Sequence, residues 1–194
     1  MPRARIEDVA RARRILLYGV TGSGKSTAAA RLSRALGLPL HLADEEIGFL
    51  PAQEAAWTNP PRGRQLALAR TLVAQDEWVL DSAYGLWQDS VLERAQVVVA
   101  LDYPRVVSLA RLVRRTARRV RDQERVCNGN TESWARAVGP ESILLWHART
   151  FSRKRRFVRE LEDSAQGPPV LRLHRPHELD RLLAGLGRHR GADG

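Results

Sequence analysis

Cysteine, methionine and lysine are scarce in this chain of 194 residues, which contains one cysteine, one methionine and two lysines. The single cysteine, Cys127, cannot form an internal disulfide and has no cysteine partners for a Cys-rich zinc site. No apolar run approaches the roughly 20 residues that a membrane span needs. The basic N-terminus lacks the apolar core of a signal peptide. We therefore expect a cytoplasmic protein in a reducing setting, with no membrane partner, as a monomer or a homodimer.

Arginine supplies almost all of the positive charge, and the formal net charge of the chain is +10. A charge of this size is typical of proteins that bind a nucleotide, a phosphorylated substrate or a nucleic acid. It is equally consistent with solubility and codon bias, so the total alone does not select a partner. The hydrophobic content of 43% and the charged content of 28% are ordinary for one globular domain of this length.

Apolar runs alternate with amphipathic segments along most of the chain. Buried strands are predicted at residues 14–19, 39–43, 77–80, 95–101 and 170–173. Helices are predicted at residues 26–36, 64–74, 86–94, 105–121, 141–162 and 176–186. The proline-containing residues 48–63 are interpreted as a loop. This alternation predicts an α/β fold with parallel βαβ units and a five-stranded sheet between helices.

The segment 105–121 has the pattern of an amphipathic helix. Six residues follow the helical period, and we assign them to its apolar face: Val106, Leu109, Ala110, Val113, Ala117 and Val120. The arginines of this segment are interpreted mostly as solvated surface.

A glycine-rich phosphate-binding motif follows the first predicted strand. The pattern G-x-x-x-x-G-K-[ST] is met by Gly19, Val20, Thr21, Gly22, Ser23, Gly24, Lys25 and Ser26, with Thr27 directly after them. Glycines let the backbone curl around phosphate oxygens, which the N–H groups of the loop and of the next helix then bind. Lys25 is expected at the β- and γ-phosphates, and the Ser26 hydroxyl is expected to coordinate Mg²⁺. ATP and Mg²⁺ are therefore the predicted cofactors.

Three acidic residues follow predicted strands, namely Asp44, Asp81 and Asp102. Ligands of parallel sheets bind beyond the C-terminal ends of the strands, where Gly19 also lies, so these positions predict a site. Asp81 is the candidate for holding a Mg²⁺-bound water beside Ser26, and capping of the next helix or turn is its structural alternative. Asp102 is interpreted as shaping the turn that follows it, with metal binding as the lesser alternative.

Six segments carry a family resemblance: GVTGSGKST (19–27), Asp44-Glu45, WVLDSAYG (78–85), ALDYPR (100–105), VCNGNTESW (126–134) and WHARTFSRKR (146–155). In these segments the chain resembles the adenylate-kinase-like P-loop family, which includes nucleoside monophosphate, shikimate and gluconate kinases. Within that family it is most similar to the bacterial topology-modulation or adenylate-kinase-related ATPase proteins. Where adenylate kinases continue with Gly-Phe-Pro-Arg, Asp81 is followed by Ser-Ala-Tyr, so AMP is not implied as the acceptor.

The resemblance implies a three-layer P-loop NTPase fold of the nucleoside monophosphate kinase type. Its sheet would have five parallel strands in the order 2-3-1-4-5, and a short helical lid would carry arginines. The corresponding division of the chain is a basic extension at residues 1–13, a kinase-like domain at 14–187 with the lid at about 119–135, and a disordered tail at 188–194.

Catalytic roles are predicted for a carboxylate and for lid arginines. Asp44, and Glu45 beside it, lie where a carboxylate could orient or deprotonate an acceptor hydroxyl; first-turn acids at a helix N-terminus are the alternative. Lid arginines can stabilise a transferring phosphoryl group, and the candidates are Arg115, Arg119, Arg149 and Arg153. Three aromatic side chains either line an acceptor pocket or belong to the core, namely Trp57, Tyr84 and Trp87.

These features favour an ATP-dependent phosphotransferase that acts on a small molecule, such as a nucleoside, a nucleotide or another hydroxyl acceptor. The alternative is a nucleotide-binding regulatory or nucleic-acid-associated P-loop ATPase, which the net charge and the basic ends of the chain support. Because the basic residues do not form a known DNA-reading motif, nucleic acid is the less favoured partner.

Overall fold

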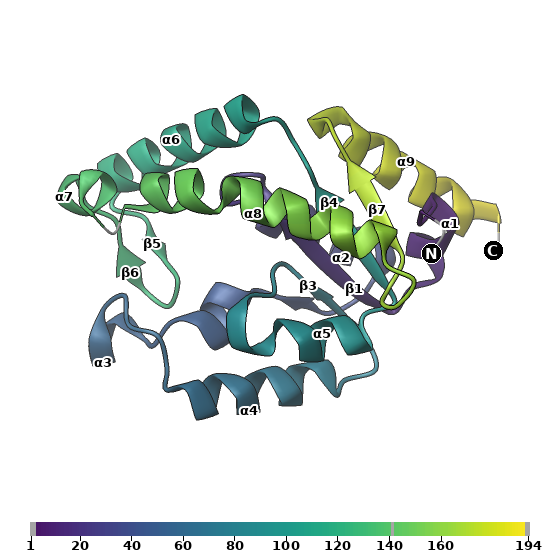
Figure 1. The fold of residues 1–194 in the computed structure, drawn as a ribbon, viewed down its shortest axis with the longest axis horizontal. Helices are drawn as coiled ribbons and strands as arrows, with labels where there is room; N and C mark the ends of the chain where they lie inside the picture. Colours follow the sequence, from purple (N-terminus) through teal and green to yellow (C-terminus); the bar gives the residue numbers. More distant parts are fainter. Residues whose placement is uncertain (1–2, 141, 193–194) are drawn as a thin grey trace.

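A five-stranded parallel sheet forms the centre of the computed structural model, which describes residues 3–140 and 142–192 (Figure 1). Its strands are β1 (Arg14–Gly19), β2 (Leu40–His41), β3 (Trp78–Leu80), β4 (Val97–Leu101) and β7 (Val170–Leu173). They lie in the order β2-β3-β1-β4-β7, and all neighbours are parallel. With β7 counted as the fifth strand of the sheet, this is the predicted order 2-3-1-4-5, and the fold class is confirmed.

Helices cover both faces of the sheet and give the molecule three layers. One apolar core lies between the sheet and the helices α1 (Ile6–Arg11), α2 (Lys25–Leu36) and α9 (Pro176–Ala192). The other core lies under α4 (Arg62–Val73), α5 (Gln88–Arg94) and α8 (Ile143–Asp163). Every residue of β4 is buried, as expected for a strand that is covered on both faces.

The N-terminal segment, expected as a basic extension, packs into the first core. The Ala4 N–H donates to the Val170 carbonyl at 3.1 Å, and Val9 is fully buried in α1. At the other end, α9 continues to Ala192, into the segment 188–194 for which we expected disorder. Residues 193–194 lie outside the described residues, and the prediction for them stays untested.

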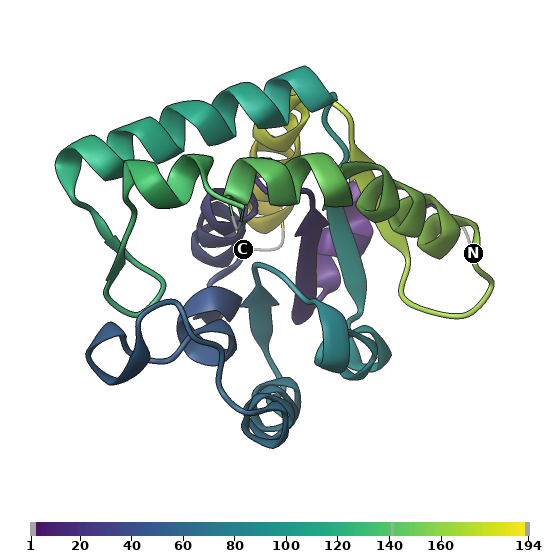
Figure 2. The ribbon, with the colours of Figure 1, turned by 60° about the vertical axis from the view of Figure 1, so that its left-hand side comes forward.

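A lid-like segment joins α6 (Arg105–Asp122) to α8, and Figure 2 shows these two helices side by side above the sheet. Between them lie an antiparallel hairpin, β5 (Arg125–Val126) and β6 (Asn130–Thr131), and the short helix α7 (Trp134–Val138). The predicted lid at about 119–135 thus contains a hairpin in addition to helix. Among the described residues, no helix is long and apolar enough to cross a membrane.

The apolar face predicted for α6 is buried only at its C-terminal end, at Val120. Val106 and Val113 are 72% and 46% exposed, and the inner face carries Ser108, Leu112 and Thr116 instead. The reason is that α6 lies against the glycine-rich loop rather than over an apolar core. A Cβ at Gly22 would lie 2.4 Å from the Ser108 carbonyl oxygen, an approach that favours small or polar inner residues.

An ion-pair network joins β4, β7 and α8 at one end of the sheet. Asp102, 4% exposed, pairs with Arg155 from α8 and with Arg172 from β7, the latter at 3.1 Å. Arg172 also pairs with Glu162, which in turn contacts Arg3 at 3.1 Å. Both carboxylate oxygens of Asp102 are therefore engaged by arginines, and Asp102 has a structural role rather than a metal-binding one.

The network predicts a large loss of stability when its central carboxylate is removed. Asp102→Ala leaves two largely buried guanidinium groups without their partner, and we expect the free energy of unfolding to fall by about 3 kcal/mol. Urea denaturation measures the change. The matched control is Asp122→Ala, which removes a carboxylate from an exposed pair with Arg121 and should leave the midpoint unchanged. Equal midpoints for the two variants would contradict the prediction.

Candidate active site

The glycine-rich loop turns sharply between β1 and α2, at the C-terminal edge of the sheet. Gly22 and Gly24 have φ values of 81° and 95°, in the left-handed region that glycine adopts without strain. The helix α2 begins at Lys25, so its N-terminal amides face the loop. From α6, Arg111 donates to the Ser23 carbonyl at 3.1 Å and lies over the Tyr103 ring. The predicted nucleotide-binding residues thus form a compact turn held on one side by α6.

Lys25 is half-buried at this turn and has no acidic partner within hydrogen-bond distance. Its Nζ donates to the Val20 carbonyl at 3.1 Å. Burial lowers the pKa of Lys25 to about 7, and the positive charge of Lys154 lowers it further, while Asp81 and Asp44 act in the opposite direction. A phosphate group would supply the negative charge that this ammonium group lacks.

Ser26 and Asp81 lie together at the ends of the loop and of β3. The Ser26 hydroxyl donates to Asp81 Oδ2 at 2.5 Å, and the Ala43 N–H donates to Asp81 Oδ1 at 2.8 Å. Burial raises the pKa of Asp81, and the hydrogen bonds to Ser26 and Ala43 oppose that effect. One hydroxyl and one carboxylate suit Mg²⁺, which keeps several waters and needs few protein ligands. Among the described residues, no group of three or more His, Cys, Asp or Glu side chains is placed to hold a metal ion by itself. Waters and phosphate oxygens would therefore complete the coordination of Mg²⁺ here.

Asp44 begins a π-helical turn, η1 (Asp44–Gly48), directly after β2. The Tyr84 hydroxyl donates to Asp44 Oδ1 at 2.9 Å, and burial raises the pKa of Tyr84 well above its usual value. A Cβ at Gly48 would lie 2.4 Å from the Tyr84 hydroxyl oxygen, so this tight contact requires glycine. Asp44 itself is exposed and acts electrostatically on Lys25 and on Lys154. Asp44 is therefore an exposed carboxylate that accepts one hydrogen bond and lies near the lysine of the glycine-rich turn.

Two of the four predicted arginines come from α6 and lie near Asp44. Arg115 and Arg119 are half-buried, and the Nε of each has no hydrogen-bond acceptor in the part of the chain that the structure describes. Arg119 lies 3.7 Å from Glu132, and burial lowers the pKa of Arg115. Buried unpaired donors of this kind are suited to an anionic ligand, because phosphate oxygens would satisfy them.

The arginines predicted on α8 lie less deeply than a neighbouring lysine that the sequence reasoning missed. Arg149 and Arg153 are exposed, and Arg153 acts electrostatically on Lys154 and Tyr18. Lys154 is half-buried and lies close enough to Lys25 and Asp44 to influence their charges. Burial lowers its pKa, and Asp44 opposes that shift. The available signal was composition, since Lys154 is the second of only two lysines in an arginine-rich chain.

The aromatic candidates separate into different roles. Trp87 is 1% exposed and belongs to the second core, so it does not line an acceptor pocket. Tyr84 contacts Asp44, and Trp57 contacts the β5–β6 hairpin.

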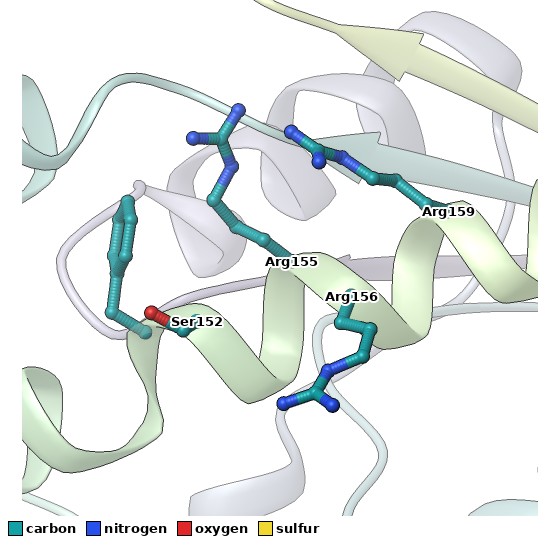
Figure 3. A pocket seen from close by; sticks show the side chains of 5 residues that line it. Ser152, Arg155, Arg156 and Arg159 are labelled. Carbon is teal, nitrogen blue, oxygen red and sulfur yellow. The ribbon is translucent and has the colours of Figure 1, made fainter.

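A cavity of about 210 Å³ lies along α8, and its lining comes from that helix alone (Figure 3): Phe151, Ser152, Arg155, Arg156 and Arg159. Figure 3 shows Arg156 pointing away from Arg155 and Arg159. Arg155 is already engaged by Asp102. Because its guanidinium groups do not converge and none of the predicted site residues lines it, we do not assign this cavity to the active site.

Comparison with known proteins places the fold in a class. No protein-family model and no curated protein matches the chain. A shikimate kinase from Acinetobacter baumannii in complex with shikimate matches with a TM-score of 0.57 and 17% identity over 97% of this chain and 98% of that one. A gluconokinase from Sinorhizobium meliloti 1021 matches with a TM-score of 0.50 and 20% identity over 92% and 93%. A shikimate kinase from Aquifex aeolicus vf5 matches with a TM-score of 0.50 and 19% identity over 93% and 99%.

These matches span nearly the whole chain, and they show that it has the fold of the P-loop kinases. At this level of identity they establish the architecture, while the roles of individual residues rest on the geometry described above.

The lowered pKa of the half-buried Lys25, to which Lys154 contributes, predicts that the affinity for nucleotide depends on pH. The free-state pKa of Lys25 is about 7, and a bound triphosphate favours its charged form, so binding takes up a proton above pH 7. The affinity for Mg·ATP is therefore full well below pH 7 and falls as the pH rises through 7, approaching about tenfold per unit at the alkaline end. Calorimetric titration between pH 7 and 9 measures it.

Two variants test the cause of this dependence. Lys154→Met removes a neighbouring positive charge, so the loss of affinity should begin at a higher pH. Lys25→Arg should weaken binding and flatten the pH profile, because arginine stays charged throughout this range. A flat profile for the unaltered protein would contradict the prediction.

The position of Asp81 beside Ser26 predicts that its substitution raises the Mg²⁺ concentration needed for nucleotide binding. Asp81→Asn keeps an acceptor for the Ala43 N–H but removes the negative charge beside Ser26. We expect the Mg²⁺ concentration that half-saturates nucleotide binding to rise about tenfold, with metal-free nucleotide affinity nearly unchanged. Fluorescent nucleotide titration at varied Mg²⁺ measures this, and the exposed Asp89→Asn is the control. An unaltered magnesium requirement in Asp81→Asn would count against Asp81 as a metal-site residue.

Proposed function

We propose that this protein is an ATP-dependent phosphotransferase that transfers the γ-phosphoryl group to a hydroxyl of a small molecule. The observation that carries the proposal is that the exposed carboxylate of Asp44 lies close enough to Lys25 and Lys154 to raise the pKa of each. This arrangement sets a candidate base beside candidate phosphate ligands at the edge where parallel sheets bind substrates.

Different residues of the site have different roles in the phosphoryl transfer. Lys25 and the loop amides bind the β- and γ-phosphates, while Arg115 and Arg119 offer unpaired donors to the charge that develops on the phosphoryl group. Ser26 and Asp81 are the residues that would hold Mg²⁺, which would supply further positive charge beside the phosphates. The acceptor oxygen forms the new O–P bond, the bond from the γ-phosphorus to the β–γ bridging oxygen breaks, and the proton passes to Asp44. ADP and the phosphorylated acceptor are the products.

Besides Lys25, Lys154 and Arg115 lie close enough to Asp44 for an electrostatic interaction, and Arg119 is a neighbour of Arg115. Gluconokinase and shikimate kinase are named for small-molecule acceptors, and the shared fold is compatible with an acceptor of that size. The resemblance to topology-modulation proteins, which rests in part on the motifs around Gly19 and Asp81, belongs to the same proposal.

A panel assay tests the proposal. ADP release from Mg·ATP is measured with nucleosides, nucleotides, sugars and hydroxy acids, and at least one acceptor should stimulate it above the rate in water. Asp44→Asn should then lower kcat by about 10²- to 10⁴-fold, because the proton acceptor is lost, with nucleotide affinity changed less than about threefold. Asp89→Asn, an exposed carboxylate on α5, is the control and should keep full activity.

Two results would contradict the proposed phosphotransferase mechanism. Absence of any stimulating acceptor would sink the phosphotransferase assignment, and full activity of Asp44→Asn would remove Asp44 from the mechanism. Salt-dependent binding to DNA or RNA that ATP modulates, without acceptor-stimulated ADP release, would favour the nucleic-acid-associated ATPase instead.

A further inference from the structure

The two neighbouring acids Asp44 and Glu45 point to different partners. Asp44 faces the lysines, whereas both carboxylate oxygens of Glu45 are occupied by the tip of the β5–β6 hairpin. The Cys127 N–H donates to Glu45 Oε1 at 2.8 Å, and the Asn128 N–H donates to Oε2 at 2.6 Å. These residues are more than 80 positions apart in the sequence, and Figures 1 and 2 both place the hairpin beside the segment that contains η1 and α3 (Ala52–Ala55).

Asn128 strengthens the same contact through its side chain and its carbonyl. Its Nδ2 donates to the Glu45 carbonyl at 2.5 Å and to the Phe49 carbonyl at 2.7 Å. Its own carbonyl accepts the Ala52 N–H at 2.9 Å. One hairpin residue therefore makes four hydrogen bonds to three positions of the facing segment.

A second attachment lies at Trp57, further along the facing segment. The Trp57 N–H donates to Asn130 Oδ1 at 2.6 Å, and its indole Nε1 donates to the Thr131 carbonyl at 3.2 Å. Arg136 lies over the Trp57 ring at 4.6 Å. Asn130 is 1% exposed, so this contact is largely shielded from water.

Unusual backbone geometry is concentrated at these contacts. Among the described residues, four non-glycine residues have positive φ: Trp57, Gln123, Cys127 and Asn128. Three of them make the hydrogen bonds just described, and Gln123 ends α6 directly before the hairpin. Such conformations persist where the surrounding structure holds them and are concentrated at functional segments.

We propose that Glu45 is a positioning residue, which couples the β5–β6 hairpin to the segment 45–57 and thereby places Asp44 opposite the arginines of α6. The inference rests on the proposed function for its catalytic part. The hairpin continues from α6, which carries Arg115 and Arg119, while Glu45 directly follows Asp44 in η1. The hydrogen bonds of Glu45 therefore link the two sides of the acceptor site.

Amide hydrogen exchange tests the coupling without any need for turnover. Glu45→Ala removes the acceptors of the Cys127 and Asn128 N–H groups, and we expect their exchange to accelerate roughly tenfold. The Ala52 and Trp57 amides do not bond to Glu45. Their exchange should accelerate to a similar extent if the hairpin and the facing segment act as one unit. Glu54→Gln, an exposed acid in the same segment, should leave all four amides unchanged.

Steady-state kinetics test the positioning role. Glu45→Ala should lower kcat roughly tenfold with the KM for Mg·ATP changed less than about threefold, because nucleotide binding does not use the hairpin contact. The assay uses the acceptor found in the panel or, without one, water as the acceptor of Mg·ATP hydrolysis. Glu45→Gln keeps one acceptor oxygen and should recover part of the rate. Asn128→Ala removes different hydrogen bonds between the same two segments, those to the Glu45 and Phe49 carbonyls, and it should also lower kcat.

Each outcome has a fixed meaning. Faster exchange at Cys127 and Asn128 alone, with Ala52 and Trp57 unaffected, overturns the coupling. Unchanged kcat in a Glu45→Ala protein with accelerated exchange overturns the positioning role. If the unaltered protein neither transfers phosphoryl groups nor hydrolyses Mg·ATP, the proposed function fails and the positioning role falls with it, while the exchange data still decide the coupling.

Discussion

The carboxylate of Asp81 connects the two halves of the candidate site. One oxygen accepts the hydroxyl of Ser26, at the nucleotide side, and the other accepts the N–H of Ala43, directly before the acceptor-side turn. Parallel strands bring these groups to one edge, but strand order alone does not set their spacing to hydrogen-bond distance. Because Asp81 is buried, each bond lies in a low-dielectric setting where its loss is costly. The positions of Ser26 and Asp44 relative to each other depend on this one side chain.

The contrast between lysine and arginine explains much of the electrostatics. A guanidinium group stays charged when it is buried, whereas an ammonium group can lose its proton at an accessible pH. Both lysines of the chain lie where other positive charges are close, including Arg115 beside Lys25. Because the pKa of Lys25 is about 7, an anion that binds beside it favours uptake of a proton. Of the thirty arginines, Arg115 and Arg119 lie at the candidate site, and others form ion pairs and ring contacts or lie on the surface.

Local patterns in the sequence were sufficient for the sheet and for the loop, but not for contacts between distant segments. The loop was identified by glycine spacing, and the strands by continuous apolar runs such as residues 97–101. The hairpin was missed because residues 122–133 are polar apart from Val126 and Cys127, and its stabilising partners, Glu45 and Trp57, are distant in the sequence. Lys154 was overlooked in favour of adjacent arginines, since helical spacing does not indicate which cation is buried. The face of α6 was misassigned because the loop, not an apolar core, sets its burial.

The N-terminal segment covers part of one edge of the sheet. β7 is the last strand of the sheet, and an unprotected strand at that position offers backbone groups to strands of other molecules. The Ala4 amide occupies one such carbonyl on Val170, and α1 packs on α9 beside it. A chain that began at β1 would keep every residue of the candidate site but expose this border, so aggregation rather than loss of chemistry would limit its use.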